Sequence, residues 1–324
     1  MKRKLESYSF SKAEIEILIE VANENHSLSL LRKRLHIKPN LLSHDLRKLS
    51  QKGIIVFKKK GKLTFTKKGA ARKHVYFADS KHASLLRDLL ITNSHIQWED
   101  ILSGLGIEVL FQILNEYEVK FTNFSKVTFW RYSRDLMARG IVKLDDGHYV
   151  ITPRFSVIAA FLTEFQHFLL NNFVKSISER ATVLWEKDFE CLIRVPKNAN
   201  ILPKTLLKTA TSRLDDFGIQ ILSDFDIYFY SKRKKVIGIE DVILHTLLLE
   251  KSNVRYVTYS LLVLKNNMRS VDKEYLLKEA QRLGLGLQIN AMFQFLKTKG
   301  KRGGMTLPTW PEFVSKAKEY MVTV

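Results

Sequence analysis

Two pairs of carboxylates in the last third of the chain have a spacing that could bind a metal ion. Asp224 and Asp226 flank one position at a predicted strand, and alternate carboxylates on a strand can hold Mg²⁺ in nucleotidyltransferases. Those enzymes also need a Gly-Ser-type phosphate loop just upstream, which residues 218–221 do not provide. Asp188 and Glu190 precede another strand, but the Glu-x-Lys that follows such a pair in nucleases is missing. We therefore predict no metal site at either pair.

His245 and Cys191 are the other side chains whose types suggest catalysis. His245 lies on the apolar side of a predicted helix, which is typical of a histidine in a core or an interface. Cys191 is the only cysteine and lies in an apolar strand, so its thiol lacks the exposed, electropositive setting of a reactive one. A single cysteine also excludes a disulfide framework and a multi-cysteine zinc site. Because Walker and dinucleotide-binding glycine patterns are missing as well, we expect no enzyme, no cofactor and no metal.

A different chemistry is indicated by a helix predicted over residues 38–52. Leu42, Leu46 and Leu49 recur at helical spacing and form its buried stripe. The other face carries short polar and cationic side chains, which hydrogen bond to base edges in the major groove and to phosphates. The predicted DNA contacts on this helix are Lys38, Asn40, Ser43, His44, Arg47 and Lys48.

A lysine-rich hairpin is predicted directly after this helix. Gly53 ends the helix, and strands 54–57 and 62–66 follow. Lysines at a hairpin tip suit contact with phosphates or the minor groove, and a solvated turn is the alternative. The predicted contacts at the tip are Lys58, Lys59, Lys60 and Lys62.

The elements around this helix complete a module. A first helix is predicted over residues 11–24, where Ser11 and Glu14 have the spacing of a capping box, and a second helix begins at Ser27. Residues 67–92 look helical and connective. Three helices followed by a hairpin are typical of a winged helix-turn-helix.

The pattern of helix, glycine and hairpin occurs a second time, 87 residues later. A helical pattern from about residue 98 to 114 opens this copy, and its third helix covers residues 125–139. Gly140 and strands 141–144 and 149–152 follow. The inward residues expected on the third helix are Phe129, Tyr132, Leu136 and Met137.

This second copy is poorly equipped to bind DNA. Asp145 and Asp146 at its hairpin tip would repel phosphates, and its third helix carries Trp130. Such a copy is typical of a domain that packs, dimerises or binds a partner. DNA contact remains the alternative on account of Arg131, Arg134 and Arg139.

The remainder of the chain changes character after a helix predicted over residues 153–178. This helix is dense in phenylalanine, which indicates a core or a dimer face. An α+β region with a helical end then follows. Strands are predicted at 191–195, 218–222 and 225–230, and helices at 204–217, 239–251, 256–265, 272–283, 287–297 and 310–321. The basic run 231–235 is either a solvated turn or a second contact with nucleic acid or an acidic partner.

Charge is concentrated at the start of the chain. Of 324 residues, 53 are Lys or Arg and 33 are Asp or Glu, a formal net charge of +20. Residues 1–76 hold 19 cations against 6 carboxylates, residues 77–181 hold 11 against 12, and residues 182–324 hold 23 against 15. A basic region confined to one module is the electrostatic footprint of a nucleic-acid surface, because neutralising phosphates releases condensed counterions.

Composition places the chain among ordinary globular proteins, at 45% hydrophobic and 27% charged residues. No apolar run approaches the ~20 residues that span a bilayer. The first residues are not a signal peptide. We therefore expect a cytoplasmic protein with no membrane contact.

Two segments near the C-terminus carry a diffuse family resemblance. Residues 238–245 (GIEDVILH) and 274–285 (EYLLKEAQRLGL) look like the C-terminal half of AbiEi-type regulators. These are antitoxins of type IV toxin–antitoxin systems, which bind operator DNA through an N-terminal winged helix and repress their own operon. The resemblance covers roughly residues 190–297 together with the N-terminal winged helix, and it implies autoregulation and a toxin-type protein partner, a nucleotidyltransferase. This chain departs from that pattern by its second winged helix.

Taken together, these observations predict an α+β, mainly helical protein with two tandem winged helices and a small α+β domain. The predicted domains are residues 1–76, 77–181 and 182–324. The expected function is transcription regulation, as an autorepressor that binds double-stranded DNA and forms a homodimer through its second copy and Phe-rich helix. The alternatives are a protein that neutralises a partner through residues 182–324 and a DNA-targeted nuclease or nucleotidyltransferase.

Overall fold

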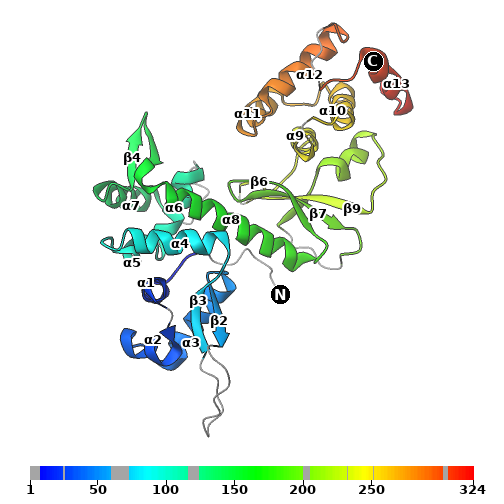
Figure 1. Cartoon of the computed structure of the whole chain (residues 1–324). Helices are drawn as coiled ribbons and strands as arrows, with labels where there is room; N and C mark the ends of the chain where they lie inside the picture. Colours follow the sequence, from blue (N-terminus) through cyan, green and yellow to red (C-terminus); the bar gives the residue numbers. More distant parts are fainter. Residues whose placement is uncertain are drawn as a thin grey trace. The chain divides into compact units, whose positions relative to one another are not determined.

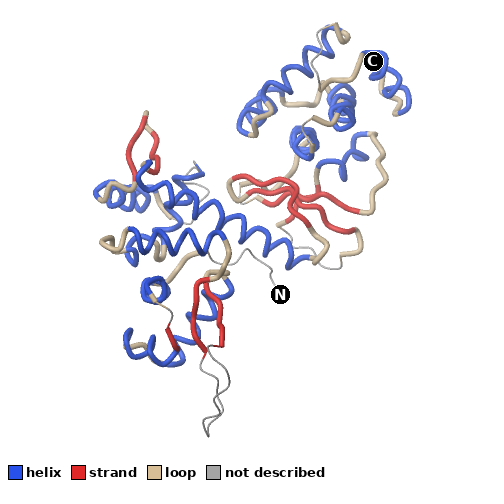
Figure 2. The backbone as a smooth tube through the Cα atoms, in the orientation of Figure 1, coloured by secondary structure: helices blue, strands red, loops and turns tan. Residues whose placement is uncertain are grey.

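The computed structural model describes residues 8–24, 26–59, 73–115, 124–199, 205–231, 233–250, 252–301 and 306–324. It is an α+β fold in which helices predominate (Figures 1 and 2). The chain divides into two compact units, of which one ends at Leu169 and the other runs from Leu170 to Val324. Among the described residues, no helix is long and apolar enough to cross a membrane.

The first unit begins with helices whose caps agree with the sequence. Ser11 accepts a hydrogen bond from the Glu14 amide, and the Glu14 carboxylate accepts one from the Ser11 amide, which confirms the predicted capping box. Ser27 caps the second helix, and Pro39 occupies the first position of the third. The first six elements are α1 (Lys12–Asn23), β1 (His26–Ser27), α2 (Leu28–Leu35), α3 (Pro39–Gln51), β2 (Ile55–Lys59) and β3 (Lys73–Phe77).

These strands form a three-stranded antiparallel sheet in the order β1-β3-β2. Ile55 pairs with Phe77 and Lys59 with Lys73. The expectation of a helical connection from residue 67 is therefore wrong at 73–77, where Val75 and its neighbours pair with two strands at once. Backbone hydrogen bonds to partners distant in sequence override the local pattern there. The return strand predicted at 62–66 lies outside the described residues.

The helix predicted from about residue 98 to 114 is broken in the structure. Gly104 adopts a positive φ of 54°, and its amide donates to the Phe10 carbonyl at 2.7 Å, so the chain turns between two helices. The helices of this part of the unit are α4 (Lys81–Thr92), α5 (Trp98–Ile101) and α6 (Leu105–Asn115).

The second copy of the helix–hairpin pattern is built as predicted. It consists of α7 (Lys126–Ala138), β4 (Val142–Asp145) and β5 (His148–Ile151). Asp146 and Gly147 join the strands with positive φ values of 46° and 79°, as a two-residue type I′ turn requires. Leu136 is buried as predicted, whereas Phe129, Tyr132 and Met137 are only half-buried.

The two hairpins point away from each other within the first unit, β2–β3 at one end and β4–β5 at the other (Figures 1 and 2). The Phe-rich segment forms η2 (Pro153–Phe155) and α8 (Ser156–Ile177). Its aromatic rings lie inside the protein: Phe161 and Phe165 are fully buried, and Phe165 stacks on Phe10 with ring centroids 5.7 Å apart. The Phe-rich helix is therefore core and not a dimer face, because the unit itself covers its aromatic stripe.

The second unit contains a four-stranded antiparallel sheet in the order β6-β7-β9-β8. One face, which carries Leu192 and Phe229, packs in the core formed with the helices that follow. On the other face Tyr230 meets Phe173, with ring centroids 4.9 Å apart. The strands are β6 (Thr182–Lys187), β7 (Glu190–Pro196), β8 (Leu206–Lys208) and β9 (Phe225–Tyr230).

Two predictions in this unit are wrong. Residues 204–217 are not one helix, because Leu206–Lys208 pairs with β9, and a 3₁₀ helix, η3 (Ala210–Phe217), follows. Residues 218–222 are not a strand, since none of them joins the sheet and Leu222 is fully exposed. Pairing between distant strands decided this order, which local apolar patterns do not encode.

The helical end agrees with the sequence. It comprises α9 (Ile239–Leu249), α10 (Val254–Asn266), α11 (Lys273–Arg282), α12 (Gly286–Thr298) and α13 (Trp310–Glu319). Capping interactions mark several starts: Asp272 caps α11, and Thr309 forms a capping box with Glu312. Leu262, Ile289 and Phe313 are fully buried, so these helices share one core.

Candidate nucleic-acid interface

Helix α3 presents one apolar and one polar face. Leu42, Leu46 and Leu49 are buried, with 4% of Leu42 and none of Leu49 exposed. Pro39 sets the first helical φ, and the extended Lys38 precedes it. The apolar stripe therefore fixes the rotation of α3 about its axis and turns the opposite side chains to solvent.

The structure places all six predicted contacts of this helix at the surface: Lys38, Asn40, Ser43, His44, Arg47 and Lys48. His44 Nδ1 lies 3.3 Å from Asp45 Oδ1. Within the described part of the chain, Lys38, Arg47 and Lys48 have no carboxylate at ion-pairing distance. Their charges are therefore available to a ligand.

A buried ion pair holds the C-terminal end of α3, and sequence reasoning missed it. Lys52 Nζ lies 2.9 Å from Glu14 Oε2, with 8% and 2% of the two side chains exposed. The same Glu14 oxygen accepts the capping-box hydrogen bond from Ser11 at 2.8 Å. Burial lowers the pKa of Lys52, although its hydrogen bond to Glu14 opposes that effect. The sequence signal that could have revealed this pair was the capping-box residue Glu14, because its carboxylate can accept a further hydrogen bond from a buried cation.

Gly53 follows at a position where no other residue fits. Its φ is 66°, and a Cβ atom there would overlap the ring of Phe168 on α8. His82 packs against the same ring, with centroids 4.4 Å apart, and a ring nitrogen lies 3.1 Å from the Lys52 carbonyl. Burial lowers the pKa of His82. Core contacts therefore fix the junction between α3 and the hairpin.

Of the cations predicted at the tip of the lysine-rich hairpin, Lys58 is the one whose side chain the structure describes. Lys58 is 55% exposed, lies 3.8 Å from Asp79 Oδ2 and sits 5.6 Å from the Tyr76 ring centroid. Lys59 ends β2 and pairs with Lys73. Lys60 and Lys62 lie outside the described residues.

The helix, the glycine and the first strand of the second copy correspond to those of the first at a sequence offset of 87 residues. Gly140 has a φ of 70° against 66° at Gly53, and the closing hydrogen bonds match. Ile54 donates to the Leu49 carbonyl at 3.1 Å, and Ile141 donates to the Leu136 carbonyl at 3.0 Å. The offset of 87 residues therefore relates α7 to α3 residue by residue.

Applied to the exposed face, this offset shows a systematic change of chemistry. Asn40 and Ser43 correspond to Val127 and Trp130, and two cations become carboxylates. Lys48 corresponds to Asp135 and Lys58 to Asp145, whereas Arg47 corresponds to another arginine, Arg134. The second copy keeps the helix and the glycine stop of the first, keeps cations on the helix, and gains apolar and acidic side chains on its exposed face.

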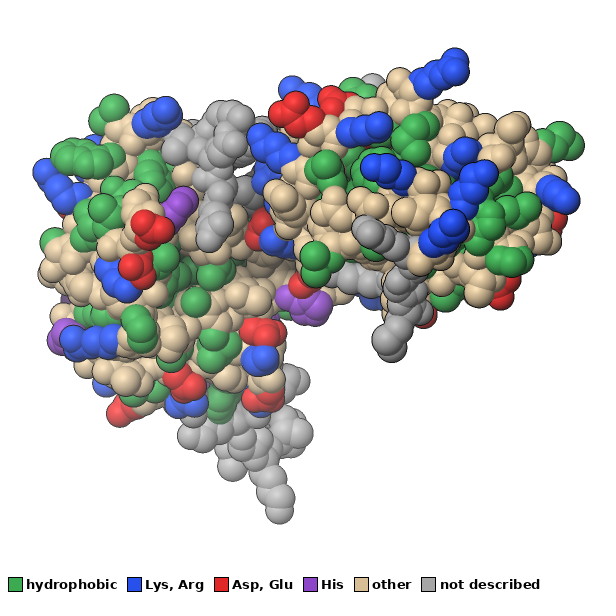
Figure 3. All heavy atoms as spheres, turned by 90° about the horizontal axis from the view of Figure 1, so that it is seen from above, with side chains coloured by type: hydrophobic (Ala, Val, Ile, Leu, Met, Phe, Trp, Pro, Cys, Tyr) green, Lys and Arg blue, Asp and Glu red, His purple; other side chains and the backbone are tan. Residues whose placement is uncertain are grey.

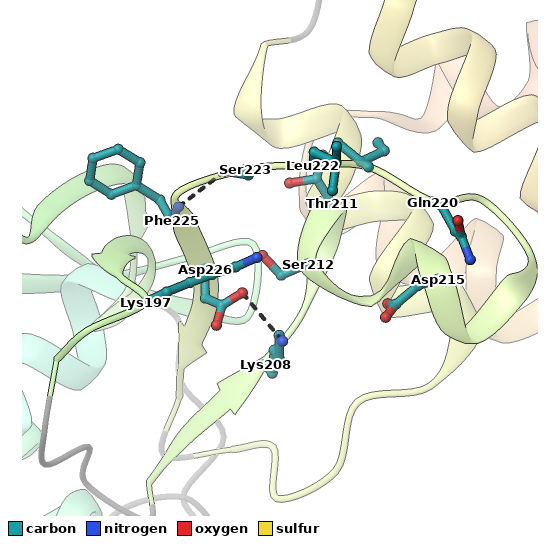
Figure 4. A pocket seen from close by; sticks show the side chains of 11 residues that line it. Lys197, Lys208, Thr211, Ser212, Asp215, Gln220, Leu222, Ser223, Phe225 and Asp226 are labelled. Carbon is teal, nitrogen blue, oxygen red and sulfur yellow. Dashed lines mark hydrogen bonds and ion pairs between the residues drawn. The ribbon is translucent and has the colours of Figure 1, made fainter.

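The carboxylate pair at 224 and 226 is not arranged around a metal site. Asp226 lines a cavity of about 230 Å³, where its Oδ1 lies 3.3 Å from Lys208 Nζ (Figure 4). Asp224 is exposed, and its backbone carbonyl accepts a hydrogen bond from the Lys197 amide. Across the described residues, no group of three or more His, Cys, Asp or Glu side chains could hold a metal ion.

Glu190 of the second carboxylate pair belongs to a buried ionic network. It is 1% exposed, and its Oε2 lies 2.7 Å from Arg282 Nη1. Its Oε1 accepts from the Ser231 hydroxyl at 2.6 Å and lies 3.4 Å from Arg233 Nε. Asp188, nearby, has a pKa raised by burial. The charge of Glu190 is therefore balanced inside the protein by Arg282 and Arg233.

The network continues through Lys234, which corrects the interpretation of the basic run 231–235 in part, since Lys235 is exposed and Lys232 lies outside the described residues. Lys234 pairs with Asp241, lies 3.2 Å from Glu279 Oε1 and donates to the Tyr275 hydroxyl at 2.5 Å. Burial would raise the pKa of Glu279, but Arg282 and Lys234 lower it to about 2. Neither a solvated turn nor an external contact describes Arg233 and Lys234, because both neutralise internal carboxylates.

His245 and Cys191 have the buried settings that the sequence indicated. His245 Nδ1 lies 2.8 Å from the Thr209 hydroxyl, and burial lowers the pKa of His245 to about 3. Cys191 is fully buried, which raises the pKa of its thiol. Both groups therefore stay neutral near pH 7.

Comparison with known proteins adds one match. A protein-family model described as HVO_2833_C, C-terminal, matches residues 204–322, which cover the segment from β8 to α13. No curated protein and no solved structure matches the chain. The family description states no activity, and the matched residues lie within the second unit.

Proposed function

We propose that this chain is a DNA-binding transcription regulator that reads the major groove with α3 and contacts the backbone with the hairpin β2–β3. The observation that carries the proposal is the exposed face of α3. Its cations are unpaired within the described part of the chain, while its leucines anchor it in the core. Such a helix can enter a groove without loss of core packing.

A winged-helix arrangement of the first unit is part of this proposal. It is supported by the element order helix, strand, helix, helix, strand, strand and by the sheet order β1-β3-β2. In such an arrangement the third helix contacts bases and the hairpin contacts the backbone. The excess of cations in residues 1–76 supports the same assignment.

Individual roles follow from side-chain chemistry. Arg47 can donate two parallel hydrogen bonds to a guanine, and Asn40 can do so to an adenine. Lys38 and Lys48 are point charges at the two ends of α3 and suit phosphates. Arg47 and Asn40 would therefore supply sequence preference, while the lysines supply affinity.

The test is a fluorescence-anisotropy titration against the upstream region of its own gene and against scrambled DNA, at two salt concentrations. An autorepressor binds the upstream region more tightly at both salts. Arg47→Ala should cost about 1–3 kcal/mol on the preferred sequence alone. Lys48→Ala should weaken both DNAs and reduce the salt slope by about 1.

Lys278→Ala is the matched control, since Lys278 is an exposed lysine of α11 in the second unit. It should leave both DNAs and the salt slope unchanged. If Arg47→Ala and Lys48→Ala behave like this control, α3 is not the DNA surface and the proposal fails.

A further inference from the structure

The outer face of α7 and β4–β5 exposes large apolar side chains. Val127 is 74% exposed, Trp130 53% and Leu144 59%. Figure 3, which views the protein from above relative to Figure 1, shows hydrophobic side chains at the surface beside Lys and Arg. Exposed apolar patches of this kind mark interaction sites.

Helix α7 and the hairpin β4–β5 are neighbours in the fold. Leu144 pairs across the hairpin with Tyr149, so both side chains lie on the same side of the sheet. The Tyr149 ring meets Phe129 of α7 edge to face, with centroids 5.4 Å apart. The hairpin is therefore held against α7 by this contact and projects from it to its acidic tip (Figure 1).

This surface carries both signs of charge. Arg134 stacks over the Trp130 ring at 4.9 Å, and Arg131 is exposed on the same helix. Asp145 and Asp146 lie at the hairpin tip. Asp145 pairs with Lys143 at 2.7 Å, but both side chains are at least half exposed, so the pair can exchange partners at little cost.

We propose that this face binds a second copy of the chain about a two-fold axis. The tip carboxylates of each copy would meet Arg131 and Arg134 of the other, with Val127 and Trp130 packed between them. A two-fold interface must be self-complementary, and a face with a basic helix beside an acidic tip meets that condition. The tip carboxylates would repel the phosphates of DNA, and they would also repel a uniformly acidic protein. Tryptophan and arginine are also the residues that most often dominate interface energies.

Charge exchange tests this geometry, starting from the mass of the full chain by sedimentation equilibrium at micromolar concentration. The wild type should have twice the chain mass of 37.7 kDa. One variant, Arg131→Glu with Arg134→Glu, reverses the charge of two side chains on α7. The other changes the tip, Asp145→Lys with Asp146→Asn, because asparagine tolerates the positive φ of 46° at that position.

Each variant alone should be monomeric, because like charges would face each other across its two-fold axis. An equimolar mixture should form a heterodimer, because the reversed helix of one then faces the changed tip of the other. The control Lys273→Glu with Lys278→Glu, two exposed lysines of α11, should stay dimeric. Circular dichroism verifies that every variant is folded.

Three results would overturn the proposal. They are a monomeric wild type, variants that remain dimeric alone, and folded variants that do not associate when mixed. Loss of DNA affinity in the helix variant at unchanged mass would instead make this face a nucleic-acid contact. These readouts do not depend on α3, so they are separable from the proposed function.

Discussion

The two helix–hairpin copies of the first unit share the order of helix, glycine and hairpin, and they differ in what holds them and in what they expose. In the first copy, Lys52 is buried against Glu14 and Gly53 against Phe168. The corresponding Arg139 and Gly140 of the second copy are exposed. The copy with the polar, cationic outer face is thus the one anchored most tightly to the core. The proposed function requires α3 to present its side chains in fixed register, and this anchor would hold the helix in place.

Removing the cation at the end of the third helix should change the free energy of unfolding far more in the first copy than in the second. Lys52→Ala leaves Glu14 buried without a countercharge and should lower the free energy of unfolding by about 3–5 kcal/mol. Arg139→Ala removes an exposed side chain, which bonds only the Asp135 carbonyl of its own helix among the described residues, and should change it by less than about 0.5 kcal/mol. Urea denaturation measures both. Equal losses would mean that the buried pair does not anchor α3.

A smaller contrast is expected at the two glycines. Gly53→Ala combines a strained positive φ, about 1–2 kcal/mol, with overlap of the Phe168 ring, about 1–3 kcal/mol more. At Gly140 no atom lies within 4 Å of the added Cβ, so Gly140→Ala should cost only the backbone strain. The same denaturation experiment compares them. If Gly140→Ala destabilised the protein as much as Gly53→Ala does, overlap with the Phe168 ring would not explain the cost at Gly53.

The outer faces can be contrasted by exchange of one residue. Lys48→Asp installs in α3 the residue that α7 carries at that place, and should weaken binding to all DNA about tenfold, because a charged hydrogen bond is lost. The reciprocal Asp135→Lys should not weaken it. Anisotropy titrations at low salt measure both. If Asp135→Lys strengthens DNA binding as much as Lys48→Asp weakens it, the second face contacts DNA as well.

The smallest effect concerns pH and the histidine that packs at the first junction. Burial holds the pKa of His82 below its ordinary value of 6.5, so its protonation favours the unfolded chain. Stability should be constant above about pH 6.5 and fall as the pH drops below it towards the lowered pKa. Urea midpoints at pH 7.5 and 5 for wild type and His82→Gln should show a smaller pH dependence in the variant. His148→Gln, an exposed control on β5, should keep the wild-type dependence.

Local signals in the sequence determined many of the helix ends and the second hairpin of this protein. Ser11 with Glu14, Ser27 and Pro39 mark helix starts, and Gly53 and Gly140 mark ends, because caps and positive φ values depend on residues a few positions apart. The leucine stripe of α3 likewise followed from helical periodicity, and with it the outward placement of the predicted contacts.

Only the tertiary structure decided features that join distant parts of the chain. The pairing of residues 73–77 and 206–208 into sheets overrode local patterns that favoured helix. In the sequence, Arg233 and Lys234 belong to a basic run. In the structure, they form ion pairs with Glu190, Asp241 and Glu279. Side-chain charge is visible in a sequence, but the carboxylate that neutralises it can lie anywhere in the chain. The sequence therefore determined the helix ends that local caps mark, and the fold determined the long-range strand pairing and which charges remain exposed.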